Sequence, residues 1–210
     1  MRLKNRQLFY SGLYVILDKG ILGTFENIIR VLRLIKKVKP GIIQYRNKDG
    51  LPYDMLKDCL LIKRLAHAQK AFFIVNDYPE IAVITDADGL HLGQDDISIS
   101  VARKILSPDK LIGKSCHSLK QALSAQKEGA DYLGIGPIFS TPTKPEYQPV
   151  GLGLINKVKE KINLPIFAIG GINADNVKLV MDAGATGVAV CRASYQNTTL
   201  KKLSQVLGKG

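Results

Sequence analysis

Two short stretches of the sequence carry carboxylates where a metal ion could be bound. Asp77 ends the run FFIVND, and Asp95 and Asp96 end the run GLHLGQDD, so each acidic position follows an apolar segment. Mg²⁺ prefers oxygen ligands and is usually held by one or two carboxylates together with substrate phosphate. We therefore predict that Asp77 and Asp96 bind Mg²⁺, although the spacing alone separates Asp96 from Asp95 only weakly.

Hydrogen-bond donors occupy similar positions after other apolar runs. The cationic candidates are Arg46, Lys48, Lys144 and Arg192, and the neutral ones are Gln44, Asn76, Ser115, Thr141 and Thr143. Such donors beside a Mg²⁺ ion suit a substrate that carries phosphate groups. Because polar residues are common wherever a strand meets a loop, the inference rests on the whole set rather than on any single member.

A glycine pair and a long loop extend this set. In AIGGINADN, Gly170 and Gly171 would let backbone N–H groups approach a phosphate, although glycines serve a tight turn equally well. The stretch GPIFSTPTKPEYQPVGLG is the longest expected loop, and long loops in compact domains are often binding loops. Thr141, Thr143 and Lys144 of this loop could close over a substrate.

Short β-branched runs that alternate with longer helical patterns indicate βα units around a parallel sheet. Eight strands are expected, over residues 13–18, 41–46, 72–77, 89–93, 111–117, 132–139, 165–171 and 187–192. This pattern predicts a single (β/α)8 TIM barrel over residues 1–210, with functional side chains at the carboxyl ends of the strands. An open doubly wound sheet is the alternative, but VILDKGILG replaces the dinucleotide-binding GxGxxG after the first strand.

One expected helix has clear end signals. Ser118 and Gln121 form a candidate capping box at its start, and Gly129 offers a C-terminal stop. Leu119, Ala122 and Leu123 fall at the i, i+3, i+4 spacing of one helical face. Such helices would cover the outside of the sheet.

The composition is that of a globular protein, with 46% hydrophobic and 23% charged residues. No apolar run is long enough to cross a bilayer and no cleavable signal is evident, so a membrane partner is not expected. Cys59, Cys116 and Cys191 are widely spaced without a CxxC motif, which argues against disulfides and a zinc site. Reduced thiols fit the cytoplasm, the expected location.

The net charge of +12 favours anionic partners and brings nucleic acid into consideration. The Lys and Arg residues, however, are scattered over expected helices, and no stripe interleaves them with aromatic residues. We therefore expect small-molecule substrates and no nucleic acid. Nothing in the sequence decides between a monomer and a homo-oligomer.

Several of these motifs together resemble the thiamine phosphate synthase family. They are GIIQYRNK, VND, GLHLGQDD, GKSCHS, GADYLGIGPIFSTPTK, PIFAIGGI and AGATGVAV, and they occur in the family's order over about residues 13–194. The resemblance implies that 4-amino-2-methyl-5-hydroxymethylpyrimidine diphosphate condenses with a plain or carboxylated thiazole phosphate to give thiamine phosphate and pyrophosphate. It also implies a dissociative reaction assisted by Mg²⁺.

The same resemblance implies roles for individual residues. Asp77 and Asp96 match the metal ligands, which selects Asp96 over Asp95. The contacts to the pyrimidine diphosphate match Gln44, Arg46, Lys48, Asn76, Ser115 and Lys144, of which Arg46, Lys48, Ser115 and Lys144 are the expected catalytic residues. The contacts to the thiazole phosphate match Thr141, Thr143 and Gly171.

One departure from the family pattern concerns the end of the last strand. The family usually has an aliphatic residue and then a serine that binds phosphate, whereas this chain has Cys191 and Arg192. Arg192 would either bind the phosphate or point outward. Two alternatives therefore remain: a thiazole tautomerase relative that uses His117 as acid or base, and a non-catalytic phosphate-binding barrel.

Overall fold

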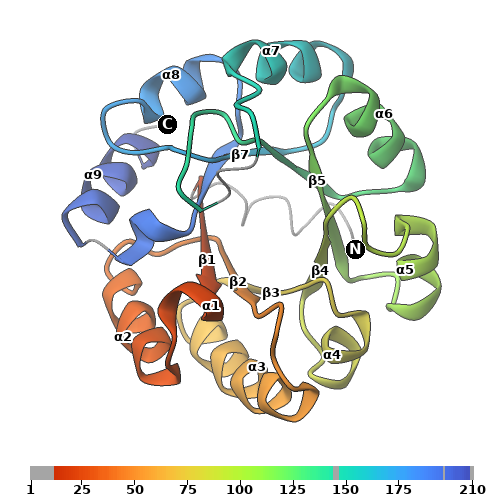
Figure 1. Cartoon of the computed structure of the whole chain (residues 1–210), viewed down its shortest axis with the longest axis vertical. Helices are drawn as coiled ribbons and strands as arrows, with labels where there is room; N and C mark the ends of the chain where they lie inside the picture. Colours follow the sequence, from red (N-terminus) through yellow and green to blue (C-terminus); the bar gives the residue numbers. More distant parts are fainter. Residues whose placement is uncertain (1–11, 144–146, 196, 209–210) are drawn as a thin grey trace.

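The computed structural model describes residues 12–143, 147–195 and 197–208, and its strands form a closed barrel in sequence order (Figure 1). All neighbouring strands are parallel, and β1 pairs with β8 to close the barrel. The strands are β1 Leu13–Asp18, β2 Ile42–Arg46, β3 Phe72–Asn76, β4 Gly89–Leu92, β5 Leu111–Cys116, β6 Tyr132–Ile135, β7 Ile166–Ile169 and β8 Gly187–Val190. The predicted (β/α)8 TIM barrel is confirmed.

The helices surround this barrel (Figure 1). They are α1 Lys19–Leu22, α2 Phe25–Ile35, α3 Pro52–His67, α4 Pro79–Ile84, α5 Ile99–Ile105, α6 Leu119–Glu128, α7 Leu152–Lys161, α8 Val177–Asp182 and α9 Asn197–Leu207, with a 3₁₀ helix, η2, over Arg192–Tyr195. Proline begins α3 and α4, where its missing N–H costs no helical hydrogen bond. Within the described ranges, none of the helices combines the length and apolar character that a membrane span requires.

Side chains of the strands alternate between two separate cores. Outward-facing residues such as Val15, Ile43 and Leu133 pack with the buried faces of the helices. Inward-facing residues form a second cluster that fills the barrel, composed of Tyr14, Ile16, Ile42, Ile74, Tyr132, Phe167 and Ala189. The interior between the strands is therefore packed with side chains.

Helix α6 differs from the expected burial pattern. Ser118 caps its start by accepting a hydrogen bond from the Gln121 N–H, and Gly129 ends it in the left-handed conformation, as predicted. The buried residues are Ala122 and Ala125, whereas Leu123 is 44% exposed, so its prediction as a core residue was wrong. The buried face of α6 runs through Ala122 and Ala125, and Leu123 lies to one side of it.

Three strands end two or more residues earlier than the apolar runs suggested. β6 stops at Ile135, before Pro137, which has no N–H to donate to a neighbouring strand. β7 stops before Gly170, whose φ of +98° is incompatible with an extended strand. β8 stops at Val190 because Arg192 already belongs to η2.

At the amino ends of the strands, the base of the barrel, three hydrogen bonds of the same kind join neighbouring strands. Asp88, just before β4, accepts from the Phe73 N–H of β3 at 2.7 Å. Asp131, just before β6, accepts from the Ile112 N–H of β5 at 2.8 Å. Thr186, just before β8, accepts from the Ile166 N–H of β7 at 3.0 Å. We call these three bonds the base clamps; each joins two neighbouring strands at the end opposite their carboxyl ends.

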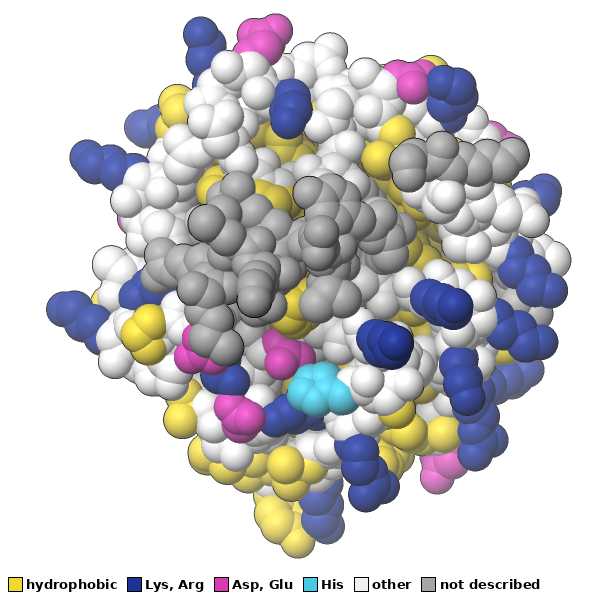
Figure 2. All heavy atoms as spheres, turned by 180° about the vertical axis from the view of Figure 1, so that it is seen from behind, with side chains coloured by type: hydrophobic (Ala, Val, Ile, Leu, Met, Phe, Trp, Pro, Cys, Tyr) yellow, Lys and Arg dark blue, Asp and Glu magenta, His cyan; other side chains and the backbone are white. Residues whose placement is uncertain are grey.

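Basic side chains are spread widely over the surface. On the face opposite that of Figure 1, Lys and Arg residues lie around the periphery with acidic residues among them (Figure 2). Several of them pair with carboxylates, as Arg103 does with Asp131 and Lys178 with Asp182. This distribution matches the scattering expected from the sequence.

Candidate active site

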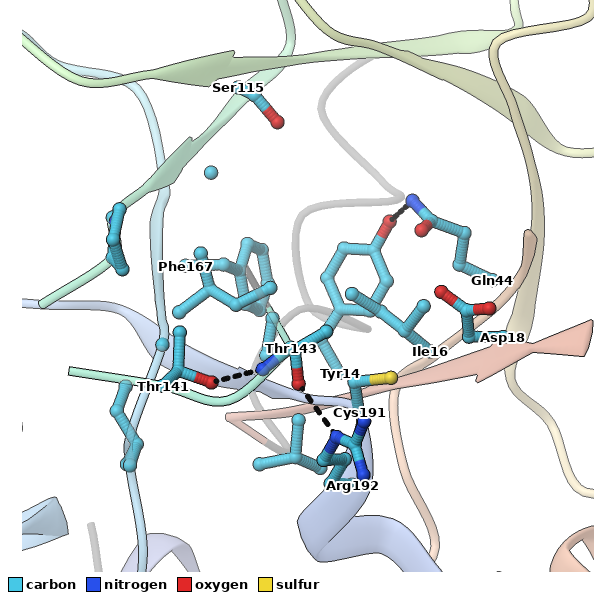
Figure 3. A pocket seen from close by; sticks show the side chains of 18 of the residues that line it. Tyr14, Ile16, Asp18, Gln44, Ser115, Thr141, Thr143, Phe167, Cys191 and Arg192 are labelled. Atoms are coloured by element: carbon cyan, nitrogen blue, oxygen red, sulfur yellow. Dashed lines mark hydrogen bonds between the residues drawn. The ribbon is translucent and has the colours of Figure 1, made fainter. Parts of the chain in front are cut away.

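A cavity of about 270 Å³ opens at the carboxyl ends of the strands, close to the smallest pockets that bind small molecules, roughly 300 Å³. Many of the predicted site residues line it: Gln44, Arg46, Asn76, Ser115, Thr141, Thr143, Gly171, Cys191 and Arg192. Figure 3 labels six of them, Gln44, Ser115, Thr141, Thr143, Cys191 and Arg192. Asp18, His117 and Gly170 also face the cavity. Lys144 lies outside the described residues.

The predicted metal ligands Asp77 and Asp96 lie together beside this cavity. Burial, together with hydrogen bonding and charge from Asp96, raises the pKa of Asp77 to about 6 against the opposing charges of Lys48 and Arg46. Two carboxylates in contact within a partly buried place are a typical arrangement around a divalent cation. Among the described residues they form no cluster of three metal-ligating side chains, so substrate phosphate and water would complete the coordination of a Mg²⁺ ion.

Backbone geometry brings these two carboxylates into place. Asp77 follows β3 with a φ of +67°, and its N–H donates to the His91 carbonyl of β4 at 2.9 Å. The Asp96 carboxylate accepts from the Gly93 N–H at 2.6 Å, which folds it back to the end of β4. Asp95 is exposed. Asp96 therefore lies next to Asp77, and its role as a metal ligand stays a prediction.

The two cations at and just after the end of β2, Arg46 and Lys48, lie beside carboxylates. The Arg46 guanidinium forms an ion pair with Asp18, which is only 3% exposed and also caps α1 through the Ile21 N–H at 3.3 Å. Lys48 is exposed, with its Nζ 3.7 Å from the Asp77 carboxylate. Arg46 is thus fixed at the cavity wall, while Lys48 stands beside the carboxylate pair.

Arg192 is directed towards the loop after β6. Its Nε donates to Thr143 Oγ1 at 3.2 Å, and the Thr143 N–H donates to Thr141 Oγ1 at 3.3 Å (Figure 3). The side chain lines the cavity and is exposed at its mouth. The two threonines and Arg192, predicted from separate parts of the sequence, therefore share one side of the cavity.

A side chain at Gly170 or Gly171 would clash with neighbouring residues. Both have positive φ, +98° and +65°, and a Cβ on Gly170 would lie 2.5 Å from the Cβ of Pro137. A Cβ on Gly171 would lie 2.6 Å from the Ser140 carbonyl oxygen. The tight turn predicted as one alternative is present, and a phosphate contact at Gly171 stays a prediction.

His117 is held by the loops at the cavity. Its Nδ1 is hydrogen-bonded to the Gly136 carbonyl oxygen, and its ring stacks on Tyr147 with centroids 5.1 Å apart. The carbonyl can only accept, so Nδ1 carries the hydrogen and the imidazole is fixed in that orientation.

Three polar residues on the floor of the cavity were not predicted as site residues. Tyr14 and His91 line the cavity, and Tyr132 lies beneath them. All three are inward-facing strand residues, and Tyr14 lies four positions before Asp18, which also lines the cavity. Their signal is a polar or aromatic residue in phase with the strand-end groups, as in Tyr14, Ile16 and Asp18.

Comparison with known proteins identifies relatives that match this chain over most of its length. A sequence model described as thiamine monophosphate synthase matches residues 13–194. The thiamine-phosphate synthase of Chloroflexus aurantiacus is 41% identical over 182 residues, which cover 86% of this chain and 83% of that protein. That of Synechococcus sp. (strain CC9311) is 38% identical over 97% of this chain but 58% of that protein. The chain thus spans little more than half the length of this cyanobacterial relative.

The fold of this chain also matches that of a solved structure. The thiamine phosphate pyrophosphorylase from Pyrococcus furiosus is 33% identical with a TM-score of 0.87, over 96% of this chain and 98% of that chain. A geranylgeranylglyceryl phosphate synthase from Thermoplasma acidophilum, at 13% identity and a TM-score of 0.73, shares the fold alone. From the sequence match over most of its length, this chain belongs to the thiamine monophosphate synthase family.

Proposed function

We propose that this protein is a thiamine phosphate synthase. It would join 4-amino-2-methyl-5-hydroxymethylpyrimidine diphosphate to a thiazole phosphate, with release of pyrophosphate. The observation that carries the proposal is that one cavity is lined by two of the predicted cations, Arg46 and Arg192, and by the predicted neutral donors, with the Asp77 and Asp96 carboxylates and Lys48 nearby. The names of relatives that match over most of their length, such as the Chloroflexus protein, support the same activity.

The cations would stabilise the leaving diphosphate. Arg46 offers a guanidinium that Asp18 already orients, and Lys48 adds an ammonium beside the carboxylate pair. Lys144 is the third cation proposed for this role. Such fixed charges stabilise the negative charge that develops as the carbon–oxygen bond to the diphosphate breaks.

Asp77 and Asp96 would hold Mg²⁺ together with the diphosphate. When bound there, the ion would neutralise part of the diphosphate charge and so favour its departure. The raised pKa of Asp77 supports this assignment, because two carboxylates in contact repel each other unless a proton or a cation lies between them.

The remaining groups would position the two organic rings. Gln44, Asn76 and Ser115 face the side of the cavity assigned to the pyrimidine. Thr141, Thr143, Gly171, Cys191 and Arg192 surround the part assigned to the thiazole phosphate. Arg192 takes the place of the usual serine and offers a charged donor, which binds phosphate more strongly than a hydroxyl does.

The reaction needs no protein nucleophile. The carbon–oxygen bond breaks first, and its electron pair leaves with pyrophosphate; the thiazole nitrogen then donates its lone pair to the exposed carbon. The protein contributes electrostatic stabilisation and alignment of the reacting atoms. A cavity rich in cations and neutral donors is suited to this kind of catalysis.

One experiment separates this proposal from its alternatives. Purified protein is incubated with both substrates, with and without Mg²⁺, and thiamine phosphate is measured by mass spectrometry. Mg²⁺-dependent product supports the synthase. Isomerisation of the thiazole phosphate without condensation would favour a tautomerase, with His117 as the acid or base. Binding of the thiazole phosphate without any turnover would favour a non-catalytic barrel.

A further inference from the structure

A chain of hydrogen bonds crosses the barrel beneath the cavity. Gln44 Nε2 donates to the Tyr14 hydroxyl at 2.7 Å, and that hydroxyl lies 3.0 Å from the Tyr132 hydroxyl. The Tyr132 hydroxyl lies 3.1 Å from His91 Nδ1, and His91 Nε2 lies 2.9 Å from Ser115 Oγ. The chain thus joins two predicted substrate contacts, Gln44 and Ser115, through three residues outside the predicted site.

The amide of Gln44 favours one direction for all four bonds. Either tyrosine hydroxyl can donate to the other, but once the Tyr14 oxygen accepts from Gln44, both hydroxyl hydrogens find a partner within the chain only if Tyr14 donates to Tyr132 and Tyr132 donates to His91 Nδ1. A neutral imidazole that accepts at Nδ1 carries its hydrogen at Nε2 and donates it to Ser115 Oγ. The Ser115 hydrogen is then available to the cavity, and so is the Gln44 carbonyl oxygen.

Two glycines make room for the rings of this chain. Gly113 lies between His91 and Tyr132 in the strand register, and a Cβ there would come within 2.1 Å of the Tyr132 ring. Gly134 pairs with Ser115, and a Cβ there would lie 3.3 Å from His91 Cε1. Both rings are buried, His91 with 8% exposure and Tyr132 with none. The small and large residues fit together so that the rings reach each other inside the barrel.

We propose that His91 and Tyr132 are positioning residues, which fix Ser115 as a donor and Gln44 as an acceptor towards the pyrimidine substrate. This inference rests on the proposed function. The amino group of an aminopyrimidine donates hydrogen bonds and suits the Gln44 carbonyl, whereas its ring nitrogens and diphosphate oxygens accept and suit the Ser115 hydroxyl. The opposite direction would present two groups of the wrong kind to that substrate.

The direction of the chain can be measured without any substrate. The protein has 3 histidines, so ¹⁵N–¹H correlation spectra of the imidazoles can be assigned with His67→Gln and His117→Gln variants. We expect His91 to be the neutral Nε2–H tautomer and His117 the Nδ1–H tautomer, which gives an internal contrast. An Nδ1–H tautomer at His91 would mean that the chain runs the other way and would overturn the proposal.

Substitution of Tyr132 tests the consequence for the substrate. Tyr132→Phe keeps the ring and removes the hydroxyl between Tyr14 and His91, so it frees His91 from a single tautomer. We expect kcat/KM for the pyrimidine diphosphate to fall about tenfold, the usual effect of one lost hydrogen bond, with KM for the thiazole phosphate changed less than about twofold. Tyr14→Phe removes two bonds of the chain, the one from Gln44 and the one to Tyr132, and should lower kcat/KM for the pyrimidine diphosphate at least as much.

Tyr45→Phe is the matched control. Tyr45 is also buried, with 2% exposure, and its hydroxyl donates to Asp58 at 2.6 Å on the outer side of β2. It therefore reports the cost of losing a buried tyrosine hydroxyl that is not part of the chain. The positioning role is wrong if Tyr132→Phe and Tyr45→Phe lower kcat/KM for both substrates by similar factors, and if each loss of kcat/KM follows that variant's loss of stability.

Failure of the proposed function would look different. Wild-type protein that gives no thiamine phosphate would remove the synthase assignment while the His91 tautomer still reports the direction of the chain. Active wild-type protein with an unaffected Tyr132→Phe variant would instead remove only the positioning role.

Discussion

Arg192 Nε donates a hydrogen bond to Thr143 Oγ1, and this contact joins the end of β8 to the loop after β6. We predict that Arg192→Ala raises KM for the thiazole phosphate about tenfold to a hundredfold, because a hydrogen bond to a charged group contributes ~1.5–3 kcal/mol. KM for the pyrimidine diphosphate should change little. Steady-state kinetics with each substrate varied in turn measures both, and Arg192→Lys should recover part of the loss. An unchanged KM for the thiazole phosphate would show that Arg192 does not bind it.

The adjacent residues Asp95 and Asp96 provide a matched pair for the metal assignment. Asp96→Asn should abolish Mg²⁺-dependent turnover, since it removes one of two carboxylates that face each other beside the cavity. Asp95→Asn, which alters an exposed carboxylate, should retain wild-type activity. Product formation over a Mg²⁺ titration, together with circular dichroism to verify folding, checks the pair. Equal activity of the two variants would contradict the assignment.

The glycine between the two rings should be important for stability. Gly113→Ala would place a Cβ 2.1 Å from the Tyr132 ring, and overpacking of a closed core typically costs ~1–3 kcal/mol of unfolding free energy. Gly153→Ala in α7 is the control, because no atom lies within 4 Å of the added Cβ and alanine favours a helix by ~1 kcal/mol. Urea unfolding should therefore move the two midpoints in opposite directions. A Gly113→Ala variant as stable as wild type would show that the interior can rearrange.

The cavity cysteine should react slowly at neutral pH. Burial raises the pKa of Cys191 to about 11, so that at pH 8 roughly one thiol in a thousand is the reactive thiolate. Because the pKa is raised, alkylation by iodoacetamide should become about tenfold faster for each pH unit between 8 and 10. Peptide mass spectrometry should find Cys191 modified before the fully buried Cys59 and Cys116, and thiazole phosphate should protect it. A rate that levels off near pH 8.5 would contradict the raised pKa.

Much of the barrel could be predicted from short patterns. The eight strands follow from β-branched runs, and the strand-end residues that line the cavity follow from their position just after those runs. The ends of β6, β7 and β8 were placed too late, because apolar residues continue into segments whose backbone is no longer extended. Hydrophobicity does not distinguish a strand from the buried turn that follows it.

The remaining features depend on contacts between distant parts of the chain. Arg192 could bind a phosphate or point outward, and its direction is decided by Thr143, which lies 49 residues earlier. Leu123 has the spacing of a core residue, yet the buried face of α6 runs through Ala122 and Ala125 and leaves it exposed. Such outcomes depend on how elements pack, which periodicity along one element does not contain.

The base clamps divide the barrel into strand pairs that can be observed one at a time. Each clamp buries one backbone N–H, that of Phe73, Ile112 or Ile166, behind the side chain that precedes the next strand. Hydrogen exchange at these three amides would therefore report the opening of the β3–β4, β5–β6 and β7–β8 pairs separately. The proposed substrate site lies at the opposite ends of the strands. A variant whose hydrogen exchange quickens at one of these amides while turnover persists would therefore reveal local opening that leaves the reaction unaffected.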